Sequence, residues 1–209
     1  MRVHSVEQGT DEWRKLRLGI PTSSEFSSLI TPGGKPSTQA RGYAHQLIAE
    51  RITGRPADDF QGTYWMQRGT ELEPEAARAY EFAQDVTTQR VGFITNDACT
   101  IGCSPDRLVI GHPGALEVKC YAPANHVAVA VDGFGEKHIP QVQGQLLIGE
   151  FEWVDRWAYH PDMPPVRVRT YRDEAYIAKL ADALARFLDT LAEMEAHLRT
   201  TGFLQEQNP

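Results

Sequence analysis

Apolar positions recur at helical spacing in several segments of the chain. Between about 173 and 200 they follow one another every three or four residues, and Gly202 comes directly after the segment. This spacing predicts an amphipathic helix that ends at a glycine. Thr22 and Glu25 have the spacing of a capping box and predict another helix start. Further helices are expected over about 38–53, ending at Gly54, over 70–84, with an apolar stripe of Leu72, Ala76, Ala79 and Ala83, and over 139–149.

Short runs rich in β-branched residues follow the 70–84 segment. TQRVGFIT, TIGCS, DRLVIG and ALEVKC predict strands, and GHPG (111–114) predicts a hairpin turn between the last two. EWVDRWAYH and VRVRTY, separated by the turn PDMPP, predict two more strands. We therefore expect an α/β fold in which helices flank a central mixed, mainly antiparallel sheet. Neither of the expected loops, at about 31–38 and 55–62, is long enough to separate domains, so we expect a single domain over 1–209.

The composition is that of an ordinary globular protein, with 41% hydrophobic and 23% charged residues. No apolar run approaches the ~18 residues of a membrane helix, and the N-terminal segment lacks the apolar centre of a signal peptide. Three cysteines are too few for a disulfide scaffold, so we expect a location in the reducing cytoplasm. The net charge of −7 argues against coating nucleic acid by bulk attraction. It does not exclude a nuclease, because carboxylates that hold metal ions also count as acids.

Two acids and a lysine converge in the segment GCSPDRLVIGHPGALEVKC (102–120). Strand alternation places Glu117 and Lys119 on one face of ALEVKC, and the hairpin at GHPG brings Asp106 alongside. Asp106, Glu117 and the backbone carbonyl of Val118 offer the oxygen ligands that hard divalent cations prefer. Lys119 could orient the attacking water, or deprotonate it if its pKa is depressed. The alternative is a solvated strand face with a weak ion pair.

The same segment resembles the catalytic core of the PD-(D/E)XK nuclease superfamily. The likeness extends over nearly the whole chain to the lambda exonuclease family and the YqaJ-type viral recombinases. It rests on six blocks: VEQGTDEWRKLRLGIPTSSE, RGTELEPEA, CSPDRL, LEVKC, PQVQGQLLIG and GFLQEQ. The resemblance implies a restriction-endonuclease-like core.

The resemblance assigns roles to individual residues. It places the metal-binding acids at Asp106 and Glu117 and the catalytic lysine at Lys119. It also places an active-site glutamate in RGTELEPEA and a glutamine in PQVQGQ, which are Glu73 and Gln141. Helical periodicity alone does not separate Glu73 from its neighbours Glu71 and Glu75, and Gln141 could equally be a polar residue on a helix surface.

The family also binds the 5′ phosphate of a DNA end. The matching residues are Arg17, Ser24 and Ser104, whose guanidinium and hydroxyl groups suit phosphate oxygens. Arg17 could instead cover apolar surface with its stem, and Ser24 could only mark a helix start. One position departs from the family pattern: Arg107 follows the acid where SPDG is common. It could contact DNA or alter the hairpin.

The cysteines, two histidines and the segment FEWVDRWAY each have a functional and a structural interpretation. A zinc site could combine cysteines and histidines, but the spacing is not that of a structural zinc site, and three cysteines do not hold a four-cysteine iron–sulfur cluster. We interpret them as core or strand residues, and we interpret FEWVDRWAY as a sheet strand rather than a base-stacking platform. The residues concerned are Cys99, Cys103, Cys120, His112 and His126.

The function that the resemblance implies is a Mg²⁺-dependent exonuclease, with Mn²⁺ as a possible substitute. It would degrade one strand of linear double-stranded DNA from the 5′ end to mononucleotides and leave a 3′ overhang for recombination. A ring-shaped homotrimer, a single-strand annealing partner and a phage or prophage origin are also implied. Two alternatives stay open: an endonuclease with the same metal site, and a catalytically silent DNA-end-binding protein. The silent form should have lost an acid or the lysine, and this chain retains all three.

Overall fold

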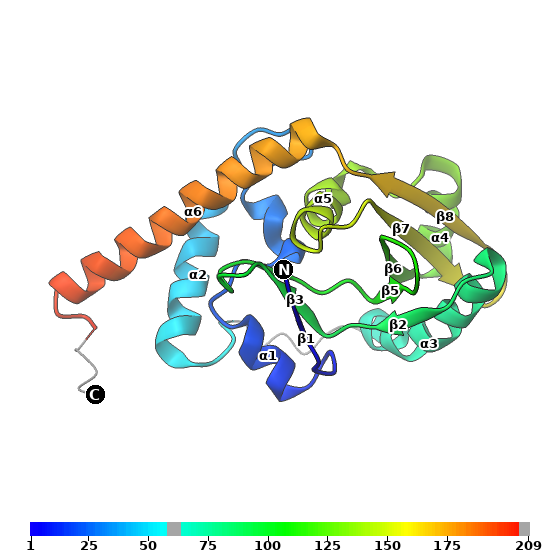
Figure 1. The fold of residues 1–209 in the computed structure, drawn as a ribbon, viewed down its shortest axis with the longest axis horizontal. Helices are drawn as coiled ribbons and strands as arrows, with labels where there is room; N and C mark the ends of the chain where they lie inside the picture. Colours follow the sequence, from blue (N-terminus) through cyan, green and yellow to red (C-terminus); the bar gives the residue numbers. More distant parts are fainter. Residues whose placement is uncertain (58–63, 205–209) are drawn as a thin grey trace.

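The larger sheet of the computed structural model, which describes residues 1–57 and 64–204, is mixed, has five strands and lies in the right half of Figure 1. Its strands stand in the order β2-β5-β6-β7-β8. Neighbours are antiparallel except β6 and β7, which are parallel. The predicted α/β class with a mainly antiparallel mixed sheet is confirmed. The strands are β2 (Thr88–Arg90), β5 (Arg107–Val109), β6 (Gly114–Cys120), β7 (Trp153–His160) and β8 (Met163–Tyr171).

A helical crossover makes β6 and β7 parallel. After β6 the chain forms α4 (Pro123–Asp132), a short 3₁₀ turn and α5 (Ile139–Ile148) before it returns as β7. Parallel neighbours need a connection of this kind, whereas a hairpin gives antiparallel strands. The α4 helix was not predicted. Its sequence PANHVAVAVD alternates valine with other residues, and Val127 and Val131 are exposed.

A second sheet of three strands has the order β1-β3-β4. The segment TQRVGFIT, predicted as a single strand, is divided between β2 of the large sheet and β3 of this one. The division falls at Gly92, where a Cβ atom would lie 2.0 Å from the carbonyl oxygen of Val6. The close approach of the N-terminal segment therefore separates the two strands. The strands of this sheet are β1 (Arg2–His4), β3 (Phe93–Thr95) and β4 (Gly102–Cys103).

The predicted long helices are present. Gly54, with φ of 64°, ends the second helix, and Asp173 caps the last by accepting a 3.0 Å hydrogen bond from the backbone of Tyr176. The third helix begins earlier than predicted. Within the described ranges, no helix is long and apolar enough to cross a bilayer. The helices, besides α4 and α5, are α1 (Asp11–Arg17), α2 (Ala40–Thr53), α3 (Tyr64–Gln84) and α6 (Glu174–Thr200).

The helix predicted to start at Thr22 is a 3₁₀ helix, η1 (Ser23–Ser28), without a capping box. The Thr22 side chain makes no cap hydrogen bond. Its hydroxyl group instead accepts from Arg17 at 3.3 Å and lies 3.2 Å from the hydroxyl of Ser24. The Thr22 hydroxyl, which suggested a helix cap, therefore makes a tertiary contact with Arg17.

The large sheet has a different chemistry on each face. One face of β6 carries Leu116 and Val118, which pack with Tyr80 and Ala76 of α3. Alternation turns Glu117 and Lys119 toward the other face, as predicted. The predicted stripe of α3 is partly wrong, because Ala83 is exposed. The buried residues of this helix centre on Ala76 and Ala77 and on Tyr80, about one turn later.

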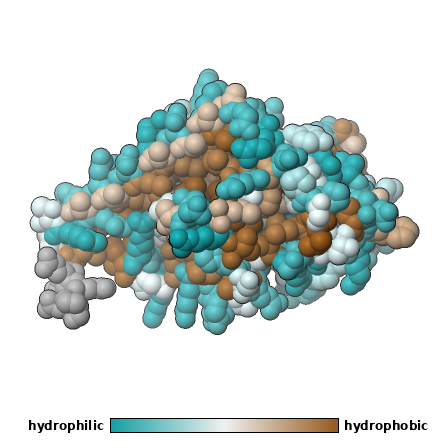
Figure 2. All heavy atoms as spheres, viewed as in Figure 1, coloured by the Kyte–Doolittle hydropathy of each residue, from teal (hydrophilic) through white to brown (hydrophobic). Residues whose placement is uncertain are grey.

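The main hydrophobic core lies between α2, α5, α6 and the two sheets. The rings of Tyr43 in α2 and Phe187 in α6 stack with centroids 5.4 Å apart. Figure 2 shows apolar atoms along the inner side of α6 and hydrophilic atoms on its outer edge. The predicted periodicity of this helix is confirmed: its buried residues are Tyr176, Ile177, Leu180, Leu184, Phe187 and Leu191.

Candidate active site

The hairpin of β5 and β6 places Asp106 beside the middle of β6. The strands pair with Arg107 opposite Leu116. Asp106, immediately before β5, accepts a 2.6 Å hydrogen bond at Oδ2 from the backbone N–H of Val118. Because Val118 lies between Glu117 and Lys119, this bond fixes the first acid against the strand that carries the other two groups. The structure thus brings together the three residues predicted from SPD and EVK.

Glu117 is held from three sides. Lys119 donates from Nζ to Glu117 Oε1 at 2.7 Å, and Gln141 donates to the same oxygen at 2.9 Å. Gln145 donates to Oε2 at 2.6 Å. The Glu117 side chain is buried at 4% exposure, so these donors replace the water it gives up.

Gln145 was missed by the sequence reasoning. It lies one helical turn after Gln141 on α5, so both amides fall on the same helix face. That i, i+4 spacing is the signal that could have found it. The helix reaches Glu117 through the crossover between β6 and β7, which the sequence pattern did not resolve.

The charges of this cluster act strongly on one another. Burial and the neighbouring carboxylate of Glu117 raise the pKa of Asp106 well above its usual value. The same Glu117 carboxylate raises the pKa of Lys119, which outweighs the opposing effect of burial. Lys119 therefore carries an ammonium group in this arrangement, which suits it to hold and orient a ligand. The depressed pKa that a general base would need is not present.

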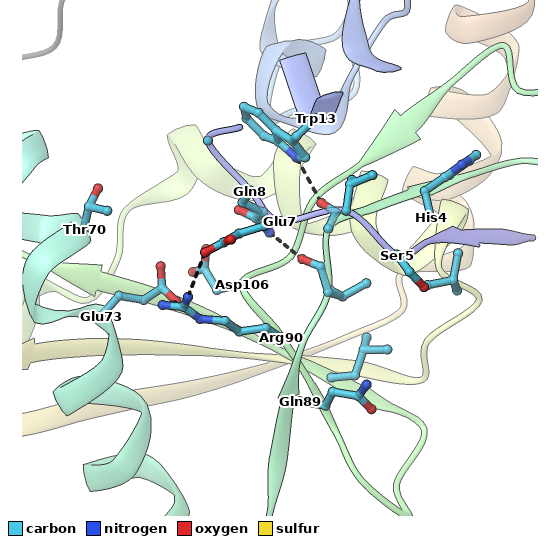
Figure 3. Close-up of a pocket in the computed structure, with 16 residues that line it drawn as sticks. His4, Ser5, Glu7, Gln8, Trp13, Thr70, Glu73, Gln89, Arg90 and Asp106 are labelled. Atoms are coloured by element: carbon cyan, nitrogen blue, oxygen red, sulfur yellow. Dashed lines mark hydrogen bonds and ion pairs between the residues drawn. The ribbon is translucent and has the colours of Figure 1, made fainter. Parts of the chain in front are cut away.

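Glu73, rather than either neighbour, lies in the active-site cavity. It lines two adjoining cavities of about 780 and 490 Å³, and Asp106 lines both of them as well. Figure 3 shows Glu73 and Asp106 around one space, with Arg90 between Glu73 and the N-terminal segment. Arg90 approaches Glu73 Oε1 at 3.4 Å. Glu71 instead accepts from Gln67 at an exposed position, and Glu75 accepts from Tyr159.

The residues predicted to bind a 5′ phosphate form one cluster. Arg17 donates from Nη1 to Ser104 Oγ at 3.2 Å and from Nη2 to Ser24 Oγ at 3.4 Å. Its guanidinium group lies 4.3 Å from the ring of Trp13, which also donates to Ser104 at 3.2 Å. Within the described ranges Arg17 has no acidic partner in an ion pair. A cation surrounded by hydroxyl groups is suited to an anion. Trp13 and Thr22 complete the cluster; the sequence reasoning missed Trp13 and assigned Thr22 only to a helix start.

A family model supports the same interpretation independently. The YqaJ-like viral recombinase domain matches residues 12–152, more than half of the chain. The chain belongs to this family. Asp106, Glu117, Lys119, Gln141 and the Arg17 cluster all lie inside the matched range. No curated protein sequence matches the chain significantly.

Solved structures with the same fold are exonucleases by their descriptions. The alkaline exonuclease LHK-Exo from Laribacter hongkongensis is 30% identical with a TM-score of 0.82, and the match covers 94% of this chain and 100% of that one. LHK-Exo in complex with dAMP matches over the same shares with 32% identity and a TM-score of 0.82. A phage-related exonuclease from Haemophilus somnus 129PT is 14% identical, with a TM-score of 0.69 over 86% of this chain and 96% of that one, and shares the fold. The fold is of the PD-(D/E)XK type.

The donor set of this YqaJ-like site fits a hard divalent cation such as Mg²⁺. No three His, Cys, Asp or Glu side chains in the described residues are grouped to hold a metal by themselves. Mg²⁺ does not require such a group, because it keeps several waters and uses one or two carboxylates. Burial, and after it the nearby Glu117 carboxylate, raise the pKa of Asp106, and a bound cation would offset the repulsion between the two carboxylates. Asp106, Glu117 and the carbonyl of Val118 are the residues that would hold it.

Of the remaining sequence candidates, Cys120 lines the smaller cavity, and the others lie apart from this site. The Arg107 guanidinium donates to Thr88 at 3.3 Å, across β5 and β2. Cys103 belongs to the main core, and burial raises the pKa of its thiol. Cys120 packs against the second core cluster, and His126 contacts the carbonyl of Pro164 at 2.9 Å. His112 is exposed in the hairpin turn, and Cys99 is within 3.5 Å of the Thr95 hydroxyl.

Proposed function

We propose that this protein is a Mg²⁺-dependent exonuclease that degrades one strand of linear double-stranded DNA from its 5′ end. The observation that carries the proposal is the Glu117 carboxylate, held by Lys119, Gln141 and Gln145 beside Asp106. This cluster combines hard oxygen ligands with a fixed cation at the wall of a cavity. Family membership and the likeness to an alkaline exonuclease support the same class of substrate.

Each residue of the cluster has a chemical task in this proposal. A bound Mg²⁺ supplies charge stabilisation at the phosphate and lowers the pKa of its water. Asp106 and Glu117 hold that ion, while Gln141 and Gln145 keep the Glu117 carboxylate in one orientation. The Lys119 ammonium orients the attacking water and offsets negative charge at the phosphorus in the transition state. Glu73 lines the same cavity opposite and completes the acidic wall.

The bond that breaks decides the products. The water oxygen bonds to phosphorus and the bond from phosphorus to the 3′ oxygen breaks, so the released nucleotide takes up a proton as its 3′ hydroxyl forms. The next nucleotide then carries a new 5′ phosphate. Arg17, Ser24 and Ser104 would bind that phosphate, which explains repeated cleavage from an end into 5′ mononucleotides. The 3′ overhang that remains is the substrate for annealing and recombination.

Assembly and partners belong to the same proposal. A ring of three subunits around the duplex and a single-strand annealing protein are what the family resemblance implies. The net charge of −7 is compatible with an acidic exterior around locally basic sites such as Arg17. Sedimentation of the purified protein tests the trimer directly.

The decisive experiment is digestion of linear duplex DNA labelled separately at each 5′ end. Parallel substrates carry a 5′ phosphate or a 5′ hydroxyl, and reactions contain Mg²⁺, Mn²⁺ or EDTA. We expect metal-dependent release of mononucleotides from phosphorylated ends and slower release from hydroxyl ends. Cleavage of closed circular DNA would indicate an endonuclease. Binding of ends without cleavage under either metal would indicate an accessory protein.

A further inference from the structure

Arg156 lies next to the catalytic strand, on the same face of the sheet. It stands on β7 directly opposite Glu117 in the parallel register of β6 and β7. Paired residues of adjacent strands point to the same side of a sheet. Arg156 therefore lies on the α4 and α5 side, where Glu117 and Lys119 also lie, and it has no place in the active-site chemistry proposed above.

The Arg156 guanidinium has no anionic partner. Within residues 1–57 and 64–204 it makes no hydrogen bond or ion pair, and its buried Nε has no partner. Other arginines of this acidic chain do find carboxylates: Arg169 binds Asp155 through two bonds of 2.8 Å. A partly buried cation without a counterion costs stability. The chain has 28 acids and 21 bases, so a shortage of carboxylates does not explain why Arg156 lacks a carboxylate partner.

Aromatic rings connect Arg156 to the active-site cavity. Its guanidinium carbon lies 4.8 Å from the centre of the Phe134 ring, and the centres of the Phe134 and Tyr121 rings are 6.4 Å apart. Tyr121 in turn lines the cavity that Asp106 and Lys119 share. Two rings, those of Phe134 and Tyr121, therefore connect Arg156 to the space in which cleavage is proposed. Stacking on an aromatic face leaves the donors at the guanidinium edge available.

The surroundings of Arg156 are positively charged. Burial, and after it the charges of Lys119, Lys137 and Arg156, lower the pKa of the nearby His138 to about 4. His138 is consequently neutral near pH 7 and does not add a charge of its own. Lys119 lines the cavity, and the charges of Arg156 and Lys137 reach the same neighbouring residue, His138.

We propose that Arg156 binds a backbone phosphate of the DNA strand next to the scissile phosphate, on the α4 side of the cavity. The inference rests on the proposed nuclease function and adds a substrate contact that the catalytic cluster and the Arg17 cluster do not supply. A guanidinium group matches phosphate oxygens with two parallel donors. The phosphodiester takes the position of the missing counterion.

The test measures DNA affinity without cleavage. Binding of a labelled, 5′-phosphorylated duplex is followed by fluorescence anisotropy in EDTA at salt concentrations from about 50 to 200 mM. Arg156→Gln is expected to raise the Kd several-fold and to reduce the slope of log K against log salt by about one. Arg186→Gln is the matched control, because Arg186 is exposed on α6 away from the cavity, and it should keep the wild-type slope. An unchanged Kd and slope for Arg156→Gln would overturn the inference.

Two further arms separate the possible explanations. Arg156→Lys keeps the positive charge but loses the two parallel N–H donors of the guanidinium group. It should therefore keep the wild-type slope of log K against log salt and bind DNA a few-fold more weakly. This variant decides the case if Arg156→Gln does not fold, and wild-type affinity in it overturns the inference. Competition by dAMP distinguishes the released nucleotide: an effect of Arg156→Gln on dAMP alone, with duplex binding unchanged, also overturns it. Failure of the wild-type protein to bind or cleave any duplex would instead refute the nuclease function itself.

Discussion

Gln145 donates a 2.6 Å hydrogen bond to Glu117, and the side chain of Gln145 is completely buried. The amide oxygen of Gln145 has no hydrogen-bond partner in the described part of the chain. An unsatisfied buried acceptor costs about 1–3 kcal/mol. A leucine or methionine would fill the position without that cost, so the amide is retained for its contact with Glu117. We conclude that α5 acts as a support that sets the orientation of the Glu117 carboxylate.

Replacing Gln145 tests this support. In Gln145→Met, Glu117 loses its only described donor to Oε2, and nuclease activity should fall about 10–100-fold, as is typical when a partner of a metal ligand is removed. Gln143→Met is the matched control on the same helix. Gln143 bonds the backbone of Tyr171 and Asp173, so its loss should lower the free energy of unfolding by about 1–3 kcal/mol and spare kcat. Full activity in Gln145→Met would contradict the role of α5.

Asp106→Asn should make the protein more stable and inactive. Ionised Asp106 is disfavoured in the folded state, since burial and Glu117 raise its pKa. Near pH 7 its charge therefore destabilises the fold, and a neutral amide removes that cost while its oxygen still accepts from Val118. In EDTA we expect the Tm to rise by about 2–4 °C for each ~1 kcal/mol gained.

The same pair of proteins tests the metal. A ligand that binds the folded state alone stabilises it, so Mg²⁺ should raise the Tm of the wild-type protein and leave that of Asp106→Asn unchanged. The control is Asp189→Asn, at an exposed position of α6. If Asp106→Asn has a lower Tm than the wild-type protein, both measured in EDTA, the Asp106 carboxylate stabilises the fold.

The parts of the site that the sequence predicted are those set by local rules. Asp106, Glu117 and Lys119 lie within one hairpin, so strand alternation and the GHPG turn suffice to bring them together. The Arg17 contact to Ser104 joins residues 87 positions apart, and only the family resemblance placed it. The same limit applied to Gln145, which reaches Glu117 across 28 positions.

Tertiary contacts explain the predictions that were wrong and the helix that was missed. The Thr22 hydroxyl, expected as a helix cap, contacts Arg17 instead. TQRVGFIT has the residues of one strand, but the N-terminal segment packs against Gly92 and divides it. The helix α4 carries a valine alternation that favours a strand, and the crossover between β6 and β7 overrides it. None of these three contacts is encoded in the local period of the chain.

Arg17 is expected to determine the preference for phosphorylated ends. Arg17→Gln should reduce the ratio of cleavage rates on 5′-phosphate and 5′-hydroxyl ends by about 10–100-fold, because a hydrogen bond to a charged group contributes about 1.5–3 kcal/mol. The rate on hydroxyl ends should change little. Arg14→Gln is the control: Arg14 is on the same helix but is exposed and paired with Asp11 at 2.9 Å. If Arg17→Gln lowers the cleavage rate equally on both kinds of end, Arg17 positions the helix and does not bind the 5′ phosphate.

The face of the sheet opposite the active site should govern stability without governing catalysis. Asp155 is fully buried and accepts from Tyr80 at 2.7 Å, while Arg169 binds both of its oxygens at 2.8 Å. Tyr80→Phe should lower the free energy of unfolding by about 1–3 kcal/mol, and Asp155→Ala by more, because it leaves the buried Tyr80 hydroxyl and the partly buried Arg169 guanidinium without their acceptor.

Urea unfolding measures both values, and the exposed Asp189→Ala should change the free energy of unfolding by less than about 0.5 kcal/mol. The activity per folded molecule should stay at the wild-type level in Tyr80→Phe, because β6 separates this network from the Glu117 face. If the activity falls by more than the amount of folded protein does, the loss of the Tyr80 contact has altered the position of β6, the strand that carries Glu117. The two faces would then have to be treated as one site, with the position of β6 coupled to the packing of α3.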